Sequence, residues 1–238
     1  MSLKGKRVVI LGGTSGIGLA AAKAFLDESA QIIIASRSAS KLSDAKAMLG
    51  GNVEVYEIDF RNEEKVSDFF KQVGNFDHLI VTAGEGAMGH FSELPVATVR
   101  EAFDSKFWGQ YISVHAALPY LNNESSITLT SGVYGIRPPQ GATTLASINS
   151  AIDGLVRSLS VDLAPIRVNV VSPGIVDTPL YGGIPKDQRQ DMYNGIAQQL
   201  PVGRVAQPED IAETYVYLAK NGFTTGTSVL IDGGAHLI

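Results

Sequence analysis

Short apolar, β-branched runs alternate with amphipathic segments along almost the whole chain, and this alternation limits its possible folds more than any other feature. The apolar runs are continuous, as is typical of parallel strands that are buried on both faces. We expect strands at Arg7–Leu11, Gln31–Ser36, Val53–Ile58, His78–Thr82, Ser126–Thr130, Arg167–Ser172 and Ser228–Ile231. Helical periodicity fills the gaps, near residues 16–29, 40–49, 62–73, 98–121, 144–163 and 208–220. The sequence therefore predicts an α/β, Rossmann-like fold: a doubly wound parallel sheet of about seven strands with helices on both faces.

No linker, repeat or shift in composition divides the chain, so we expect residues 1–238 to form a single domain. The segment from Pro173 to Pro201 differs from the rest of the chain in composition, because it is rich in glycine and proline around a short amphipathic stretch, Asp187–Leu200. It follows a strand and is long for a connection. We expect a substrate lid at about 175–201, and a surface excursion without a role is the alternative.

Charge and residue usage exclude several classes of partner. The 19 Lys and Arg against 24 Asp and Glu give a formal charge of −5, which argues against nucleic acid or an anionic membrane as the main partner. The absence of cysteine excludes disulfides, thiol nucleophiles and cysteine-ligated metals. The four histidines form no metal-binding pair, and we find neither a signal peptide nor a run of 18 apolar residues. We therefore expect a cytoplasmic protein without a metal site.

A glycine-rich loop follows the first expected strand and leads directly into a helix. In this context the backbone approaches a pyrophosphate closely, and free N–H groups and the helix dipole hold its negative charge. The loop predicts dinucleotide binding through Gly12, Thr14, Ser15, Gly16, Ile17 and Gly18.

The end of the second expected strand indicates which dinucleotide binds. An acid at this position accepts hydrogen bonds from the ribose of NAD, whereas a 2′-phosphate needs a cation. Here Ser36 stands at the position of the acid and Arg37 follows it. Arginine offers planar, multidentate donors to a phosphate, and Thr14, Ser15 and Ser38 add hydroxyl groups. This pattern favours NADP(H). In the alternative, NAD(H), Arg37 stacks on adenine.

With these motifs in place, the chain resembles the short-chain dehydrogenase/reductase family over essentially its whole length. The glycine loop is similar to the family's Gly-x-x-x-Gly-x-Gly, with Leu11 in place of the usual preceding threonine. Further similar segments are Val81-Thr82-Ala83-Gly84, the run from Arg167 to Gly174, the run from Ile175 to Pro179, the run from Gly203 to Ala212, and Thr225-Gly226 with Asp232-Gly233-Gly234. The resemblance implies the same fold and a nicotinamide cofactor.

The resemblance also implies cofactor contacts beyond the glycine loop. Asp59 matches the acid that bonds the adenine amino group, with Phe60 beside it. Thr178 matches the threonine that contacts the nicotinamide carboxamide. The matching motifs add Ala83, Gly84, Pro173, Gly174 and Ile175 to the expected cofactor site.

The family's catalytic residues are Asn, Ser, Tyr and Lys, the last two as Tyr-x-x-x-Lys on one helix. Ser131 follows the fifth expected strand, where the family serine belongs. Counting thirteen residues onward places Thr144 at the tyrosine position and Ile148 at the lysine position. The chain is therefore identified as an atypical member that lacks this pair.

A lysine stands at the family's asparagine position. We hypothesise that Lys106 replaces the missing lysine and reaches the nicotinamide ribose or the substrate oxygen. In the alternative, its side chain extends to solvent. Tyr134, three residues after Ser131, is the first candidate for a displaced proton donor, ahead of Tyr181 and Tyr193. The expected catalytic set is Ser131, Lys106 and Tyr134.

Three functions remain open at this point. The first is an NADP(H)-dependent oxidoreductase acting on a small carbonyl, alcohol or activated alkene. The second is a non-catalytic NADP(H)-binding sensor or regulatory protein, and the third is a dehydration or isomerisation with a structural nucleotide. The family implies a homodimer or homotetramer through the helices near 98–121 and 144–163 and the C-terminal segment. The identity of a small-molecule substrate would depend on residues 175–201 and on Gly86–Phe91.

Overall fold

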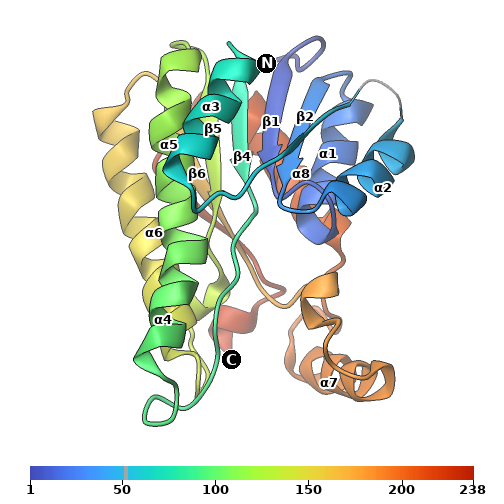
Figure 1. Ribbon diagram of the computed structural model, residues 1–238. Helices are drawn as coiled ribbons and strands as arrows, with labels where there is room; N and C mark the ends of the chain where they lie inside the picture. Colours follow the sequence, from blue (N-terminus) through green and yellow to red (C-terminus); the bar gives the residue numbers. More distant parts are fainter. Residues whose placement is uncertain (51–52) are drawn as a thin grey trace.

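One parallel sheet of seven strands, in the order β3-β2-β1-β4-β5-β6-β7, forms the centre of the protein (Figure 1). The computed structural model describes residues 1–50 and 53–238. The strands are β1 Arg7–Leu11, β2 Gln31–Ser36, β3 Glu54–Glu57, β4 His78–Val81, β5 Ser126–Thr130, β6 Arg167–Pro173 and β7 Ser228–Ile231. The α/β, Rossmann-like, doubly wound sheet expected from the alternation of runs is confirmed. Among the strands, only the ends of β3, β4 and β6 differ from the expected ranges, each by one residue, where ladder hydrogen bonds begin and stop.

Helices cover both faces of the sheet. They are α1 Gly16–Asp27, α2 Ala39–Leu49, α3 Glu63–Val73, α4 Val96–Phe103, α5 Gly109–Ala117, α6 Thr143–Asp162, α7 Lys186–Gln199 and α8 Pro208–Lys220. In Figure 1, α3, α4, α5 and α6 lie to one side of the sheet, and α1, α2 and α8 lie to the other. No helix among residues 1–50 and 53–238 is long and apolar enough to cross a membrane.

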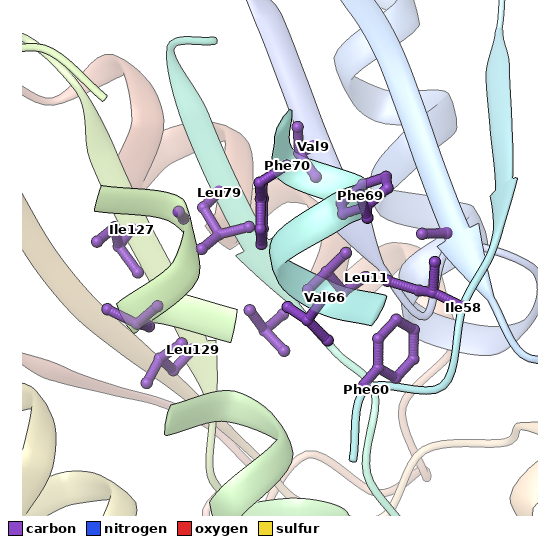
Figure 2. Packing of buried hydrophobic residues seen from close by; sticks show 14 of the residues in the cluster. Val9, Leu11, Ile58, Phe60, Val66, Phe69, Phe70, Leu79, Ile127 and Leu129 are labelled. Atoms are coloured by element: carbon purple, nitrogen blue, oxygen red, sulfur yellow. The ribbon is translucent and has the colours of Figure 1, made fainter. Parts of the chain in front are cut away.

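Each face of the sheet has its own hydrophobic core, which explains the continuous apolar runs. Val9 and Leu11 of β1 point into the core beneath α3, α5 and α6, whereas Val8 and Ile10 point into the core beneath α1, α2 and α8. Figure 2 shows the first core, where Phe69 of α3 lies among side chains of the neighbouring strands. Because successive strand residues face opposite sides, a strand between two cores needs apolar side chains at every position.

The topology places a crevice at the carboxyl end of β1. This strand pairs with β2 on one side and with β4 on the other, so the chain winds outward through β2 and β3 and then returns to continue in the opposite direction. The loops after β1 and β4 consequently diverge, and such a reversal of strand order is the usual ligand position in open α/β sheets.

The long helix expected at 98–121 is interrupted. After α4, residues Asp104–Trp108 form a π-helical turn, η1, before α5 continues and a short 3₁₀ turn, Leu118–Tyr120, ends the segment. A π turn inserts one extra residue into an α-helix and is found mostly at functional sites. Lys106 lies at the middle of this turn. Hydrophobic periodicity does not reveal such an insertion, because the helix keeps its apolar face.

The segment expected as a lid is helical over most of its amphipathic stretch. It begins with the short turn η4, Pro179–Tyr181, and continues into α7, which stands apart from the sheet in Figure 1. Val176 pairs with Ala206 in a parallel bridge, and the Asp177 N–H donates to the Ala206 carbonyl at 2.9 Å. The segment is therefore fixed to the body of the protein at residues 176 and 177.

Candidate functional site

A cavity of about 380 Å³ opens at the carboxyl ends of β1, β2 and β4. Its walls contain fourteen of the residues expected to bind the cofactor: Gly12, Thr14, Ser15, Gly16, Ile17, Gly18, Ser36, Arg37, Ser38, Asp59, Phe60, Ala83, Gly84 and Thr178. Residues that sequence reasoning missed also line it, namely Lys41, Arg61, Thr82, Glu85, Ser105, Pro179 and Leu180. The cavity follows the glycine loop and crosses from the end of β2 to the loop after β4.

The glycines of the loop are required by close contacts. A Cβ on Gly18 would lie 2.3 Å from the Gly12 carbonyl oxygen, and one on Gly12, whose φ is +96°, would lie 2.7 Å from Thr82 Oγ1. Ser15, the N-cap of α1, makes no side-chain capping hydrogen bond within the described chain. The first N–H groups of α1 therefore face the cavity without a side-chain acceptor, and this cradle fits a pyrophosphate.

The end of β2 carries the groups expected to distinguish the two dinucleotides. Thr14 Oγ1 donates to Ser36 Oγ at 3.3 Å. The Arg37 guanidinium forms an ion pair with Glu85, so the two side chains connect the loops after β2 and β4. Lys41, in the first turn of α2, is a second cation in the wall, and its N–H donates to Ser38 Oγ at 3.4 Å. Near the end of β2 the wall thus holds two cations, Arg37 and Lys41, of which Arg37 is already paired with a carboxylate.

Asp59 is engaged by a neighbouring arginine. Arg61 Nε donates to Oδ1 at 3.0 Å and Nη2 to Oδ2 at 2.8 Å. These hydrogen bonds lower the pKa of the Asp59 carboxyl to about 2. Asp59 is therefore ionised at neutral pH, and adenine would share it with Arg61. The pairing could have been suspected from the Asp-x-Arg spacing alone.

Ser131 and Lys106 come together in a second cluster beside the cavity. Lys106 Nζ donates to the Ser131 carbonyl oxygen at 3.0 Å and to Asn149 Oδ1 at 2.7 Å. A Cβ on Gly84 would lie 2.8 Å from Lys106 Cγ, so the lysine stem packs directly behind the cavity wall. The alternative of a side chain extending to solvent is wrong. Desolvation lowers the pKa of Lys106 to about 8, although part of the stem remains accessible.

The Ser131 hydroxyl points away from the cavity. It donates to the Asn149 carbonyl oxygen at 3.1 Å, and the residue is 3% exposed. Ser131 does not line the main cavity. Ser131 contributes to the cluster through its backbone carbonyl, which accepts a hydrogen bond from Lys106 Nζ.

The two α6 residues at the positions of the family's Tyr-x-x-x-Lys pair are buried. Thr144 and Ile148 are 4% and 0% exposed, and Ile148 belongs to the core beneath α6. The residues that follow them make other contacts: a Cβ on Gly86 would lie 2.1 Å from Leu145 Cδ2, and Asn149 Oδ1 accepts from Lys106 Nζ.

The three tyrosines considered as proton donors are neighbours. Burial raises the pKa of Tyr134, and burial together with Tyr134 and Tyr193 raises the pKa of Tyr181 to about 12. The rings of Tyr181 and Tyr193 meet edge to face, with centroids 5.9 Å apart. Within the described residues Tyr134 makes no hydrogen bond to Ser131 or Lys106. A raised pKa makes each of these phenols a weaker acid than a free tyrosine.

Residues Pro173, Gly174 and Ile175 lie outside the main cavity. The Gly174 N–H donates to the Ile231 carbonyl at 3.0 Å, and a Cβ on Gly174 would lie 2.8 Å from Asp232 Cα, so this turn packs on the end of β7. Ile175 lines a separate cavity of about 220 Å³. Their contacts with a cofactor stay a prediction. Across the described parts of the chain, we find no group of three or more side chains that could hold a metal ion.

Comparison with protein families and curated proteins gives consistent similarities. The family model described as Enoyl-(Acyl carrier protein) reductase matches residues 12–236. The Short-chain dehydrogenase/reductase ATR9 of Stachybotrys chlorohalonatus is 34% identical over 253 residues, which cover 99% of each chain. The L-fucose dehydrogenase of Mus musculus is 30% identical over 98% of this chain and 89% of its own length.

Solved structures are similar over the same extent. A small-chain dehydrogenase in complex with NADPH is 36% identical, with a TM-score of 0.84 and coverage of 99% of this chain and 100% of that chain. The MalC Reductase/Diels-Alderase from Malbranchea aurantiaca is 30% identical, with a TM-score of 0.92 and coverage of 99% and 98%.

Proposed function

The chain belongs to the short-chain dehydrogenase/reductase family, and on that premise we propose that it is an NADP(H)-dependent oxidoreductase acting on a small carbonyl or alcohol with an altered set of catalytic groups. The observation that carries this proposal is the position of Lys106. Its stem packs behind Gly84 in the cofactor cavity wall, and its ammonium is held by two acceptors. A partly desolvated ammonium next to a dinucleotide cavity is suited to proton transfer.

Three features support NADP(H) over NAD(H). The end of β2 presents the Ser36 hydroxyl where an acid would accept the ribose hydroxyls of NAD. Arg37 and Lys41 add positive charge to the same wall. A related small-chain dehydrogenase was solved in complex with NADPH. A nicotinamide supplies hydride chemistry, which leaves the protein to bind, orient and move a proton.

In our proposal Lys106 is the proton donor. An ammonium has three N–H groups, and Ser131 and Asn149 accept from Lys106 Nζ, which leaves one N–H for a substrate oxygen. As hydride is added to the carbonyl carbon, the C=O π electrons move to the oxygen and form an alkoxide. The alkoxide takes this proton and leaves Lys106 neutral. A pKa near 8 suits an acid that works at neutral pH, whereas the raised pKa of Tyr134 suits a residue of the substrate wall.

The altered set follows from α6. The resemblance places Thr144 and Ile148 of this helix at the positions of the family's Tyr-x-x-x-Lys pair. This same observation favours the second candidate, a non-catalytic NADP(H)-binding sensor or regulatory protein, because neither side chain donates a proton to a substrate. The buried ammonium of Lys106 is what makes us prefer the enzyme.

We further propose a homodimer or homotetramer, with 175–201 as a substrate lid. On the α4–α5 segment Trp108 and Tyr111 are 46% and 41% exposed, and their rings contact each other at 5.5 Å. Val161 near the end of α6 is 75% exposed. Large apolar side chains on these two helical segments are suited to a contact between subunits. On the lid, Leu180 is exposed and lines the cofactor cavity.

The test is stopped-flow mixing of NADPH-loaded protein with a panel of ketones, aldehydes, quinones and enones, followed by NADPH absorbance. Fluorescence titration of NADPH and NADH measures cofactor preference in the same samples. Protein-dependent oxidation of NADPH by at least one class supports the enzyme. Tight NADPH binding without turnover across the panel supports the sensor, and failure to bind either nucleotide overturns both.

A further inference from the structure

Asn149 lies at the centre of the polar cluster beside the cofactor cavity. It stands in the second turn of α6 and is 2% exposed. Its Oδ1 accepts from Lys106 Nζ at 2.7 Å, its Nδ2 donates to the Gly132 carbonyl at 3.1 Å, and its backbone carbonyl accepts from Ser131 Oγ at 3.1 Å. The side chain is thus fixed by the loop after β5 on one side and directed at the ammonium on the other.

The backbone of Lys106 is fixed as firmly as its ammonium. Gln110 Nε2 donates to the Lys106 carbonyl at 3.1 Å and to the Thr130 carbonyl at 3.0 Å, and Gln110 Oε1 accepts from the Thr130 N–H at 3.0 Å. This buried amide ties the π turn to the end of β5. The backbone and the ammonium of Lys106 are therefore both held by residues at the end of β5, so the side chain is positioned before a substrate binds.

A carboxylate lies one turn beyond Asn149 on α6. Asp153 is 9% exposed, and within the described residues its Oδ1 has no hydrogen-bond partner. Burial raises the pKa of Asp153, and the Ser228 and Ser131 hydroxyls oppose that effect. Asp153 is the charged group whose field acts on Lys106, and Arg157, one turn further along α6, acts on Asp153.

We propose that Asn149 is the positioning residue of this site, which aims the Lys106 ammonium at the substrate oxygen, with Asp153 as the buried counter-charge. The inference rests on the proposed function in taking Lys106 as the proton donor. Asn149 itself acts through Lys106 and does not touch the reacting atoms.

The chemistry explains why an amide suits this position. A neutral oxygen orients the ammonium while leaving its proton free to transfer. A carboxylate at the same distance would stabilise the charged form and retain the proton. An apolar side chain would leave the buried ammonium with one acceptor fewer, which disfavours the charged form. Replacement by aspartate and by alanine should therefore move the titration of Lys106 in opposite directions.

The experiment follows the Lys106 side-chain resonance of ¹³C-lysine-labelled protein against pH by NMR, assigned by its loss in Lys106→Arg. Asn149→Ala should lower the midpoint of Lys106 and Asn149→Asp should raise it, each by about half a pH unit or more. Asp153→Asn should lower it as well. Ser150→Ala is the matched control, because Ser150 also ties α6 to the loop after β5, donating to the Gly135 carbonyl at 3.2 Å, without contacting Lys106.

A purely structural role for Asn149 predicts equal midpoints in all folded variants, and that result overturns the proposal. Should Asn149→Ala not fold, Asn149→Ser, whose hydroxyl is too short to reach Nζ, decides in its place. The carbonyl-reduction pH profile of the best substrate in the panel should move with the NMR midpoint. Shifted midpoints without any turnover in wild-type protein leave the positioning role standing and overturn the proposed enzyme function. Turnover by the wild-type protein with unchanged NMR midpoints in the variants supports the enzyme function and overturns the positioning role of Asn149.

Discussion

The adenosine end of the cavity and the Lys106 cluster use charge in opposite ways. At the adenosine end, Arg37 and Glu85 form an ion pair whose side chains are 44% and 66% exposed, and Arg61 and Asp59 are 48% and 33% exposed. In the cluster, Asn149 and Ser131 are almost fully buried and the Lys106 ammonium binds a backbone carbonyl and an amide. The first region can rearrange around a ligand at small cost, whereas the second is held in one geometry by buried hydrogen bonds.

Removal of Lys106 is the most severe test of this contrast. In Lys106→Ala we expect carbonyl reduction to fall by about 10²–10⁴-fold, the usual contribution of a positioned proton donor. NADPH binding should change by less than about threefold, because the adenosine end holds most of the charged contacts. Stopped-flow turnover and fluorescence titration measure the two effects. Loss of binding equal to the loss of turnover would contradict the division of labour between the two regions.

The pH dependence should separate the two regions next. Reduction needs the protonated form of Lys106, whose pKa is about 8. Above that value the rate should fall about tenfold per pH unit. Asp59, with its pKa lowered to about 2 by Arg61, keeps its charge until the pH falls through that value, so NADPH binding should be flat between about pH 7 and 9. In Lys106→Arg reduction should be lost across this range, since a guanidinium does not release its proton near neutral pH; activity that keeps the same alkaline limb would assign that limb to another group.

Sequence patterns predict the fold almost completely because they record burial directly. Val8 through Leu11 contribute side chains to both cores, and such short continuous apolar runs, alternating with amphipathic segments, are typical of strands covered on both faces. The glycine loop is equally predictable from the sequence, because Gly12 and Gly18 are required by close contacts to the backbone and to Thr82. Where local chemistry alone determines a residue, the sequence is sufficient.

The Lys106 cluster could not be predicted in this way, because its geometry depends on an insertion in one helix and on contacts between residues that are distant in sequence. The π turn around Lys106 leaves the hydrophobic pattern unchanged. The acceptors of Lys106 Nζ, Ser131 and Asn149, lie 25 and 43 residues further along the chain and meet it only in the folded protein. The Arg37–Glu85 pair escaped for a related reason: its partners are 48 residues apart and meet only across the folded loops.

The adenosine end should lose affinity by a smaller factor when Arg37 is removed. In Arg37→Ala we expect NADPH binding to weaken by about tenfold, because a hydrogen bond to a charged group is worth about 1.5–3 kcal/mol before solvent screening reduces it. NADH binding should change by less than about twofold. Arg100→Ala, an exposed arginine on α4, is the control. Equal losses for both nucleotides in a fluorescence titration would instead place Arg37 on the adenine ring and favour NAD(H).

Replacement of Glu85 should give the smallest effect, and in the opposite direction. The Glu85 carboxylate competes with a 2′-phosphate for the Arg37 guanidinium, so Glu85→Gln should tighten NADPH binding by about two- to fivefold, the range that an exposed ion pair of 0–1 kcal/mol allows. NADH binding should not follow. In an Arg37→Ala background the gain in NADPH affinity should vanish, because Glu85 and the 2′-phosphate then have no guanidinium to compete for. A gain that survives in that background would mean that Glu85 repels the phosphate directly. The affinity of the adenosine end for NADPH would then depend on the negative charge of Glu85 and not on the exchange of one ion pair for another.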